Sequence, residues 1–204
     1  MNIVQLNNKF LAGNYNATQL AQFEQYLALM TKWNKTYNLT AITDLDEMVV
    51  RHLLDSLAIN PFLHGTQICD VGSGAGLPGI PLAIANSEKH FTLIDANNKK
   101  ARFLTQVKIE LKLDNVEVVH ARAEEYQPKI CFDTIVSRAF SSINVMLYTT
   151  KHLCCKDGIF LAMKGVYPED ELRDLDPNFK IKWVKELKIP ELDAQRHLAC
   201  MTIL

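Results

Sequence analysis

The stretch Asp70-Val71-Gly72-Ser73-Gly74-Ala75-Gly76 decides the fold of this chain. An apolar run at residues 67–71 leads into it and predicts a β-strand, and Pro78 and Pro81 follow it where a helix would begin. Glycine permits positive φ and lets a ligand approach the backbone closely, and proline suits the first turn of a helix because its missing N–H needs no partner there. A strand, a glycine loop and a helix in this order predict a ligand site at the carboxyl end of a parallel strand.

Strand-like and helix-like segments alternate from residue 67 to residue 164. Helices between strands make crossover connections, so the alternation predicts a parallel sheet. A short acidic helix and two strand-like runs come after Lys164, and these two runs predict an antiparallel pair at the sheet edge. The fold class is therefore α/β, with a Rossmann-like, seven-stranded, mainly parallel sheet. The expected strands are 67–71, 90–95, 116–121, 132–137, 159–164, 180–187 and 197–204, and the expected helices are 80–86, 98–112, 142–152 and 168–175.

The segment before the alternating region is helical in pattern. Apolar residues recur there at intervals of three and four, which predicts an amphipathic helix. A second helix is expected to begin at the N-cap Asp44, with Glu47 as its capping-box partner, and to end before Pro61. We therefore expect a helical extension over residues 1–66 packed on a core domain over residues 67–204. The apolar stripe of the first helix is Leu20, Phe23, Leu27, Met30 and Trp33, with Asn16 or Thr18 as its cap.

Composition excludes several classes of protein. The 204 residues are 48% hydrophobic and 22% charged, which is typical of a globular protein, and no run is long and apolar enough to cross a bilayer. Residues 1–8 lack the basic-then-apolar order of a signal peptide, so a cytoplasmic protein is expected. The five cysteines form no CxxC pair and have no histidine at ligand spacing, so neither a metal site nor a disulfide is expected. The net charge of −1 means that nucleic-acid binding would need a local basic cluster.

The spacing around the glycine loop identifies the ligand. The loop reads GxGxG instead of the GxGxxG dinucleotide fingerprint, and Asp95 ends the next strand 23 residues after Gly72, close to where an acid reaches ribose hydroxyls. A nicotinamide enzyme shares this acid, and a structural loop shares the glycines. The tighter turn favours S-adenosylmethionine over both alternatives and predicts a class I methyltransferase fold.

The segment after the fourth strand bears on the methyl acceptor. It reads Ser137-Arg138-Ala139-Phe140, without the Asn/Asp-Pro-Pro-aromatic segment that orients an exocyclic amine, and no cysteine follows a proline to activate a pyrimidine carbon. A purine ring nitrogen such as guanine N7 carries a free lone pair and needs mainly positioning. The segment is therefore consistent with a ring-nitrogen acceptor.

Six motifs in order carry a resemblance to one family. They are 33–40 (WNKTYNLT), 51–56 (RHLLDS), 70–81 with its Leu-Pro-Gly-Ile-Pro end, 137–140 (SRAF), 164–165 (KG) and 196–198 (RHL). From about residue 20 to the end, the chain resembles the bacterial small-subunit ribosomal RNA guanine-N7 methyltransferases, also called glucose-inhibited division protein B. The resemblance implies methyl transfer from S-adenosylmethionine to a guanine of the 530 loop of 16S rRNA, within the small ribosomal subunit or its precursor, by a monomer.

The resemblance also implies roles for individual positions. Arg138 would be the catalytic residue and would line the methionine end of the cofactor or the target base. Two positions depart from the usual family wording, because Ala96-Asn97-Asn98 replaces a Ser-Leu segment and Ser73 replaces a frequent threonine. The expected cofactor-binding residues are Asp70, Gly72, Gly74, Leu77, Asp95, Ala123, Glu124 and Arg138, and the expected RNA-binding residues are Arg122, Lys164 and Arg196, which would form one basic rim.

Plainer interpretations stay open for several residues. Arg51 and Asp55 are four apart on a helix, so a surface ion pair is their default, and His52 is more often structural than catalytic. The resemblance implies the alternative that this strip faces the cofactor pocket. The aromatic side chains at 23, 26 and 33 are expected in the core, and the basic run 99–102 at the solvated start of a helix. For the whole chain, a small-molecule or protein methyltransferase and an RNA-binding assembly factor with a relic pocket are the alternatives.

Overall fold

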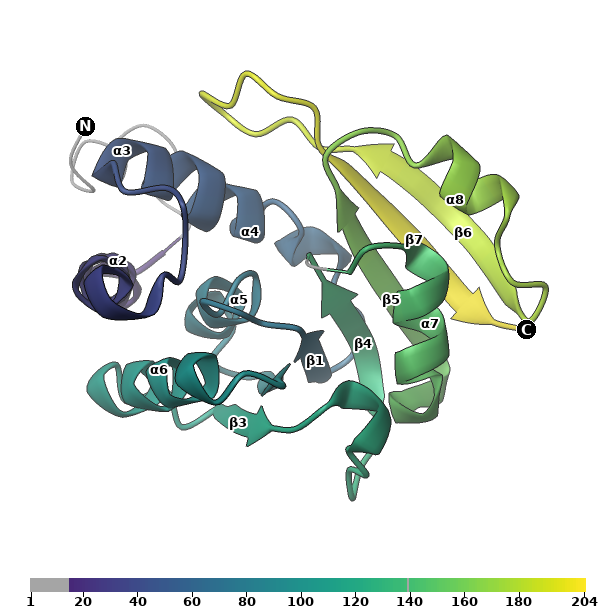
Figure 1. Ribbon diagram of the computed structural model, residues 1–204, viewed down its shortest axis with the longest axis horizontal. Coiled ribbons are helices and arrows are strands. Elements are labelled where there is room, and N and C mark those ends of the chain that lie inside the picture. Colours follow the sequence, from purple (N-terminus) through teal and green to yellow (C-terminus); the bar gives the residue numbers. More distant parts are fainter. Residues whose placement is uncertain (1–14, 139) are drawn as a thin grey trace.

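One seven-stranded sheet organises the computed structural model, which describes residues 15–138 and 140–204 (Figure 1). The strand order is β3-β2-β1-β4-β5-β7-β6. The expectations about residues 1–8 and Ala139 fall outside the described residues. The strands are β1 (Gln67–Val71), β2 (His90–Asp95), β3 (Val116–His120), β4 (Phe132–Ser137), β5 (Cys154–Lys164), β6 (Phe179–Glu186) and β7 (His197–Ile203).

Strand pairing confirms the predicted sheet. β1 pairs in parallel with β2 and with β4, and β4 pairs in parallel with β5, whereas β7 pairs antiparallel with both β5 and β6. The strand order therefore reverses between β1 and β4, and ligands of α/β sheets bind outside the carboxyl ends of strands at such a reversal. β5 begins at Cys154, five residues before its expected start, because Cys154 already pairs with Phe132 of β4.

Helices cover both faces of the sheet. On one face α2 (Ala17–Tyr37), α5 (Gly79–Ala85) and α6 (Asn98–Glu110) bury their apolar stripes in one core cluster, which contains Phe23, Ile80 and Phe103. On the other face α7 (Ile143–Thr150) and α8 (Glu169–Arg173) pack against a second cluster (Figure 1). Short 3₁₀ turns lie at η3 (Asn60–Phe62), η4 (Ala123–Glu125) and η5 (Lys151–Leu153).

The N-terminal helices join the first of these clusters. Asn16 caps α2 with the reciprocal capping box to Gln19, and Phe23, Tyr26 and Leu27 are completely buried, as expected for core residues. Side chains of this segment therefore share a core with the sheet, while the division of the chain at residue 66 stays a prediction.

The second N-terminal helix differs from its expected form. Asp44 does cap it, but the helix consists of α3 (Leu45–Met48), a π-helical turn η2 (Val49–Leu54) and α4 (Asp55–Leu57). A π turn adds one residue per hydrogen-bonded ring and so shifts which side chains share a face. Such turns occur often at functional sites, and this one carries Arg51 and His52.

The expectation of no disulfide is wrong. Cys131 and Cys155 are bonded, with their Cα atoms 5.0 Å apart. Their separation of 24 residues carries no local signal, and the pairing of Phe132 with Cys154 between β4 and β5 brings the two neighbouring cysteines together. Cys69, Cys154 and Cys200 remain as thiols.

None of the helices in residues 15–138 and 140–204 combines the length and apolarity needed to span a membrane. Within the same residues, no group of three or more His, Cys, Asp or Glu side chains is placed to hold a metal ion.

Candidate active site

The glycine loop turns sharply between β1 and α5. Gly72, Gly74 and Gly76 have φ values of 70°, 60° and 91°, a region that side-chain-bearing residues rarely adopt. The N–H of Gly72 donates to the Ile94 carbonyl of β2 at 2.9 Å, and the N–H of Gly76 donates to the Ser73 carbonyl at 2.7 Å. The loop is thus fastened both to the neighbouring strand and to itself.

Asp95 fixes the middle of this loop. Its Oδ2 accepts from the Gly74 N–H and its Oδ1 accepts from the Asn97 N–H, both at 2.8 Å. The two oxygens of a carboxylate have about four lone-pair sites, so two remain for a ligand. Asp95 and Gly72 line a cavity of about 160 Å³, here termed the glycine-loop cavity. Its other lining residues are Val71, Ile94, Ala96, Ala121, Arg122, Ala123, Glu124 and Phe140.

Two of the expected cofactor residues lie behind the loop. Asp70 is completely buried, and its Oδ2 accepts from the Gly79 N–H at 2.9 Å. Burial raises the pKa of this carboxyl to about 7, and its Oδ1 has no hydrogen-bond partner among the described residues. The side chain of Leu77 belongs to the first core cluster, next to the cis peptide bond to Pro78. Both residues shape the loop from within the protein.

The glycine-loop cavity offers acceptor oxygens and an open backbone that suit the nucleoside part of a cofactor. A Cβ atom built on Gly74 would meet only the Gly72 carbonyl at 3.8 Å and Lys100 Nζ at 3.9 Å, so the backbone is open to a ligand there. The remaining lone pairs of Asp95 suit ribose hydroxyls, and Ala123 offers a small apolar contact for a purine ring. The residues present therefore fit the expected cofactor.

A second cavity of about 340 Å³ lies at the carboxyl ends of β4 and β5, and is here termed the cationic cavity. Its polar lining residues are Arg51, His52, Asp55, Arg138, Lys164 and Arg196, and its other lining residues are Ile42, Met163 and Gly165. Arg138 faces this cavity while Phe140, two residues later, lines the glycine-loop cavity. The segment after β4 therefore borders both cavities.

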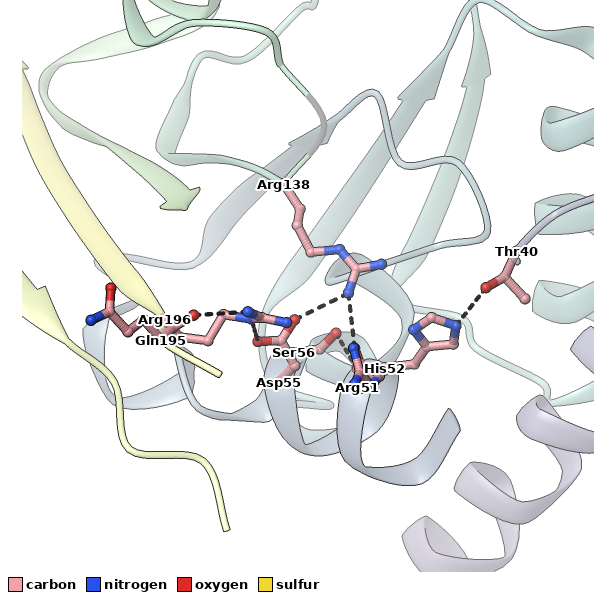
Figure 2. Close-up of polar contacts among 8 residues, drawn as sticks. All are labelled: Thr40, Arg51, His52, Asp55, Ser56, Arg138, Gln195 and Arg196. Atoms are coloured by element: carbon pink, nitrogen blue, oxygen red, sulfur yellow. Dashed lines mark hydrogen bonds and ion pairs between the residues drawn. The ribbon is translucent and has the colours of Figure 1, made fainter. Parts of the chain in front are cut away.

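Asp55 joins two arginines at the cationic cavity (Figure 2). Its Oδ2 lies 3.2 Å from Arg138 Nη1 and its Oδ1 lies 2.9 Å from Arg196 Nε. Arg51 instead pairs with Glu47, at 3.8 Å on the exposed side of the helix. The expected Arg51–Asp55 surface pair is therefore wrong, because the π turn places Asp55 inside the protein, where it is 1% exposed.

The structure divides the expected basic rim between the two cavities. Arg122 lines the glycine-loop cavity, with an exposed ion pair to Glu124 at 3.8 Å. Lys164 and Arg196 line the cationic cavity together with Arg138. Lys164 Nζ donates to Glu171 of α8 at 2.9 Å, so this lysine is held in place before any ligand binds.

His52 is a neutral ring at physiological pH. Its Nε2 lies 2.8 Å from the Thr40 hydroxyl, and its Nδ1 is buried with no partner among the described residues. Burial, and next the charge of Arg138, lower the pKa of His52 to about 4. The ring therefore supplies no positive charge to the cationic cavity, which supports its structural interpretation.

We expect the His52 ring to titrate near pH 4 in NMR spectra of the folded protein. Between that pH and about 6.5, where an unfolded histidine titrates, the unfolded chain binds the proton and the folded chain does not. The contribution of His52 to the free energy of unfolding is therefore complete above about pH 6.5 and is lost as the pH falls towards 4. A ring titration near 6.5 in the folded protein would contradict this assignment.

Pattern reasoning missed one anchor of the glycine loop. Tyr26 was expected only in the core, but its hydroxyl also donates to the Ala75 carbonyl at 2.6 Å. The two residues are 49 positions apart, and a buried tyrosine needs a hydrogen-bond partner. The position of Tyr26 directly before Leu27 of the apolar stripe was the available signal, but it does not identify the partner of the hydroxyl.

Comparison with known proteins assigns the family. A family model described as rRNA small subunit methyltransferase G matches residues 19–199. The chain belongs to this family. A ribosomal RNA small subunit methyltransferase G from Pseudomonas syringae pv. tomato is 55% identical over 181 residues, which cover 87% of this chain and 86% of that protein. The family member from Stutzerimonas stutzeri is 57% identical over 175 residues, covering 85% and 81%.

Solved structures support the fold that this family member shares with other methyltransferases. A magnesium protoporphyrin IX methyltransferase from Synechocystis superposes with a TM-score of 0.62 at 14% identity, covering 93% of this chain and 99% of that one. A SAM-dependent methyltransferase from Thiobacillus denitrificans has a TM-score of 0.53 at 13% identity, covering 74% and 90%. At such identities the likeness shows the class I methyltransferase fold alone.

Proposed function

We propose that this chain transfers the methyl group of S-adenosylmethionine to N7 of a guanine in 16S rRNA. The observation that carries the proposal is that Arg138 lines the cationic cavity while Phe140, two positions later in the chain, lines the glycine-loop cavity, which suits a nucleoside. Membership of the rRNA small subunit methyltransferase G family supports the RNA substrate.

The residues of the glycine-loop cavity would hold the cofactor. Asp95 accepts from its ribose hydroxyls, the backbone at Gly72 and Gly74 lets its amino-acid end approach, and Ala123 and Glu124 flank its adenine. Asp70 and Leu77 act through the loop, because both are buried behind it. When bound, S-adenosylmethionine supplies an electrophilic methyl group on a sulfonium.

The residues of the cationic cavity would hold the RNA. Guanine N7 carries a free lone pair at neutral pH, so the protein has to position this atom and does not have to deprotonate it. Arg138 directly follows β4 and stands two positions before Phe140, which lines the glycine-loop cavity. It is the residue proposed to orient the target base. Lys164 and Arg196, with Arg122 at the neighbouring cavity, neutralise phosphates.

The near-neutral chain points to a structured substrate. A net charge of −1 gives little general attraction to RNA, so local charge and shape would recognise the small ribosomal subunit or its precursor. We further propose that the protein acts as a monomer in the cytoplasm.

The test incubates the protein and methyl-labelled cofactor with unmodified small subunits, with naked 16S rRNA and with a protein extract. We expect label in RNA of the subunits, at a site that borohydride and aniline then cleave, as they do at N7-methylguanine. Calorimetry with S-adenosylmethionine, using Gly72→Asp as the negative control, separates an enzyme from an assembly factor with a relic pocket. Label found only in protein would overturn the proposal, and binding heat without any label in RNA would favour another acceptor.

A further inference from the structure

Asp55 is a buried carboxylate that joins three distant parts of the chain. It begins α4, directly after the π turn, and its side chain is only 2% exposed. Arg138 follows β4, 83 residues later, and Arg196 precedes β7, 141 residues later. Figure 2 shows both guanidinium groups converging on this one carboxylate.

Stability alone does not explain this arrangement. Burying a carboxylate carries a large desolvation cost, and apolar side chains of similar volume often stabilise such a place equally well. The two arginines, with side chains 28% and 21% exposed, keep contact with solvent at the cavity. The negative charge of Asp55 is therefore buried, while the positive charges of Arg138 and Arg196, which it holds in place, face the cavity.

The hydrogen bonds leave donors of both arginines available. Arg138 uses Nη1 for Asp55 and for the Arg51 carbonyl at 3.2 Å. Arg196 uses Nε for Asp55 and Nη1 for the Gln195 carbonyl at 2.8 Å. Among the described residues, Nε and Nη2 of Arg138 and Nη2 of Arg196 have no partner, and both side chains line the cationic cavity. Each guanidinium is thus fixed at one end and open at the other.

We propose that Asp55 is a positioning residue, which sets Arg138 and Arg196 in one arrangement before the substrate arrives so that both contact the target nucleotide and its phosphate. This inference rests on the proposed function. Two guanidinium groups that are already ordered hold the target base in line with the cofactor, so their order lowers the barrier to methyl transfer more than it tightens RNA binding. Asp55 itself carries the wrong charge to contact a phosphate, and both of its oxygens are already occupied by the two arginines.

Positioning and simple charge make different predictions for the kcat of Asp55→Asn, because only a positioning role predicts that kcat falls. The substitution removes one negative charge from the cationic cavity, so electrostatics alone predicts tighter RNA binding. The asparagine amide cannot accept from both guanidinium groups through two oxygens, so the arginines lose their fixed arrangement. We expect kcat to fall by about 10- to 100-fold, the size of effect that a misplacement of about 1 Å produces, while KM for the small subunit stays equal or decreases.

The control is Glu47→Gln, which removes one negative charge beside Arg51 on the exposed side of the same helix. It should leave kcat unchanged, and calorimetry should give both variants the cofactor affinity of the original chain. An unchanged kcat in Asp55→Asn would overturn the proposal, as would a raised KM with kcat intact or a weakened cofactor affinity. Because the original chain is assayed in parallel, absence of any RNA methylation by that chain would instead refute the proposed function.

A second variant covers the case in which Asp55→Asn does not fold. Asp55→Glu keeps the charge and displaces the carboxylate by roughly one C–C bond, about 1.5 Å. The same fall in kcat without a rise in KM is expected, because the position of the charge has changed and not its sign. Full activity of Asp55→Glu would show that a carboxylate anywhere near the two arginines suffices, and it would refute a positioning role.

Discussion

Replacing Asp95 with alanine should weaken binding of S-adenosylmethionine by about 100-fold. Hydrogen bonds to a charged group contribute about 1.5–3 kcal/mol each, and two such bonds to ribose hydroxyls therefore account for at least two factors of ten. The substitution also leaves the Gly74 and Asn97 N–H groups without the oxygens that accept them at 2.8 Å. Both the ligand contact and the shape of the glycine loop are lost together.

Isothermal calorimetry measures this effect directly. The cofactor affinity of Asp95→Asn should lie between those of the original chain and Asp95→Ala, about 10-fold below the original. Its amide keeps one acceptor oxygen, but its NH2 group faces one of the two backbone N–H groups. Asp157→Ala, at an exposed position of β5, is the matched control and should bind the cofactor normally. A dissociation constant within threefold of the original for Asp95→Ala would remove this residue from the cofactor site.

Replacing Gly76 with alanine should lower the free energy of unfolding by about 3 kcal/mol. The new Cβ would lie 2.6 Å from Ile80 Cγ1 and 2.9 Å from Leu104 Cδ2, inside the first core cluster, at a φ of 91°. Overpacking of this kind costs about 1–3 kcal/mol, and positive φ adds about 1–2 kcal/mol for a residue with a side chain.

Gly74→Ala separates the two causes. Its Cβ would have no neighbour closer than 3.8 Å, so only the backbone strain at a φ of 60° remains, and a loss of about 1 kcal/mol is expected. Urea denaturation of both variants gives the comparison. Equal losses of stability in Gly74→Ala and Gly76→Ala would show that Ile80 and Leu104 move aside at no cost, which would contradict a tightly packed core around Gly76.

The fold could be predicted from sequence because its signals are local. Each expected strand from 67–71 to 197–204 has a counterpart in the sheet, and the basic run 99–102 does begin a helix whose buried side carries Phe103, Leu104 and Val107. Apolar periodicity, caps and glycine turns all act over a few residues. The start of β5 lies earlier than expected because Cys154 pairs with Phe132 of β4, and such pairing between strands is not visible in composition.

The site could be predicted only in part, since its contacts join distant segments. The glycine loop and Asp95 follow from spacing along two adjacent strands. The pairing of Asp55 with Arg138 and Arg196 depends on a π turn, and no residue type predicts such a turn. The bond between Cys131 and Cys155 depends on the register of two strands. The resemblance implied one basic rim formed by Arg122, Lys164 and Arg196, but Arg122 lines the glycine-loop cavity and the other two line the cationic cavity.

The hydrogen bond from Tyr26 to the Ala75 carbonyl makes the N-terminal helix α2 a support of the glycine loop. A shortened chain beginning at residue 67 would lose the Tyr26 hydroxyl, which holds the glycine loop at Ala75. It would also expose the apolar sides of α5 and α6 to solvent. Efforts to engineer a smaller enzyme from this fold should therefore retain α2 and trim elsewhere. Through this bond, any change that tilts α2 acts directly on the glycine loop.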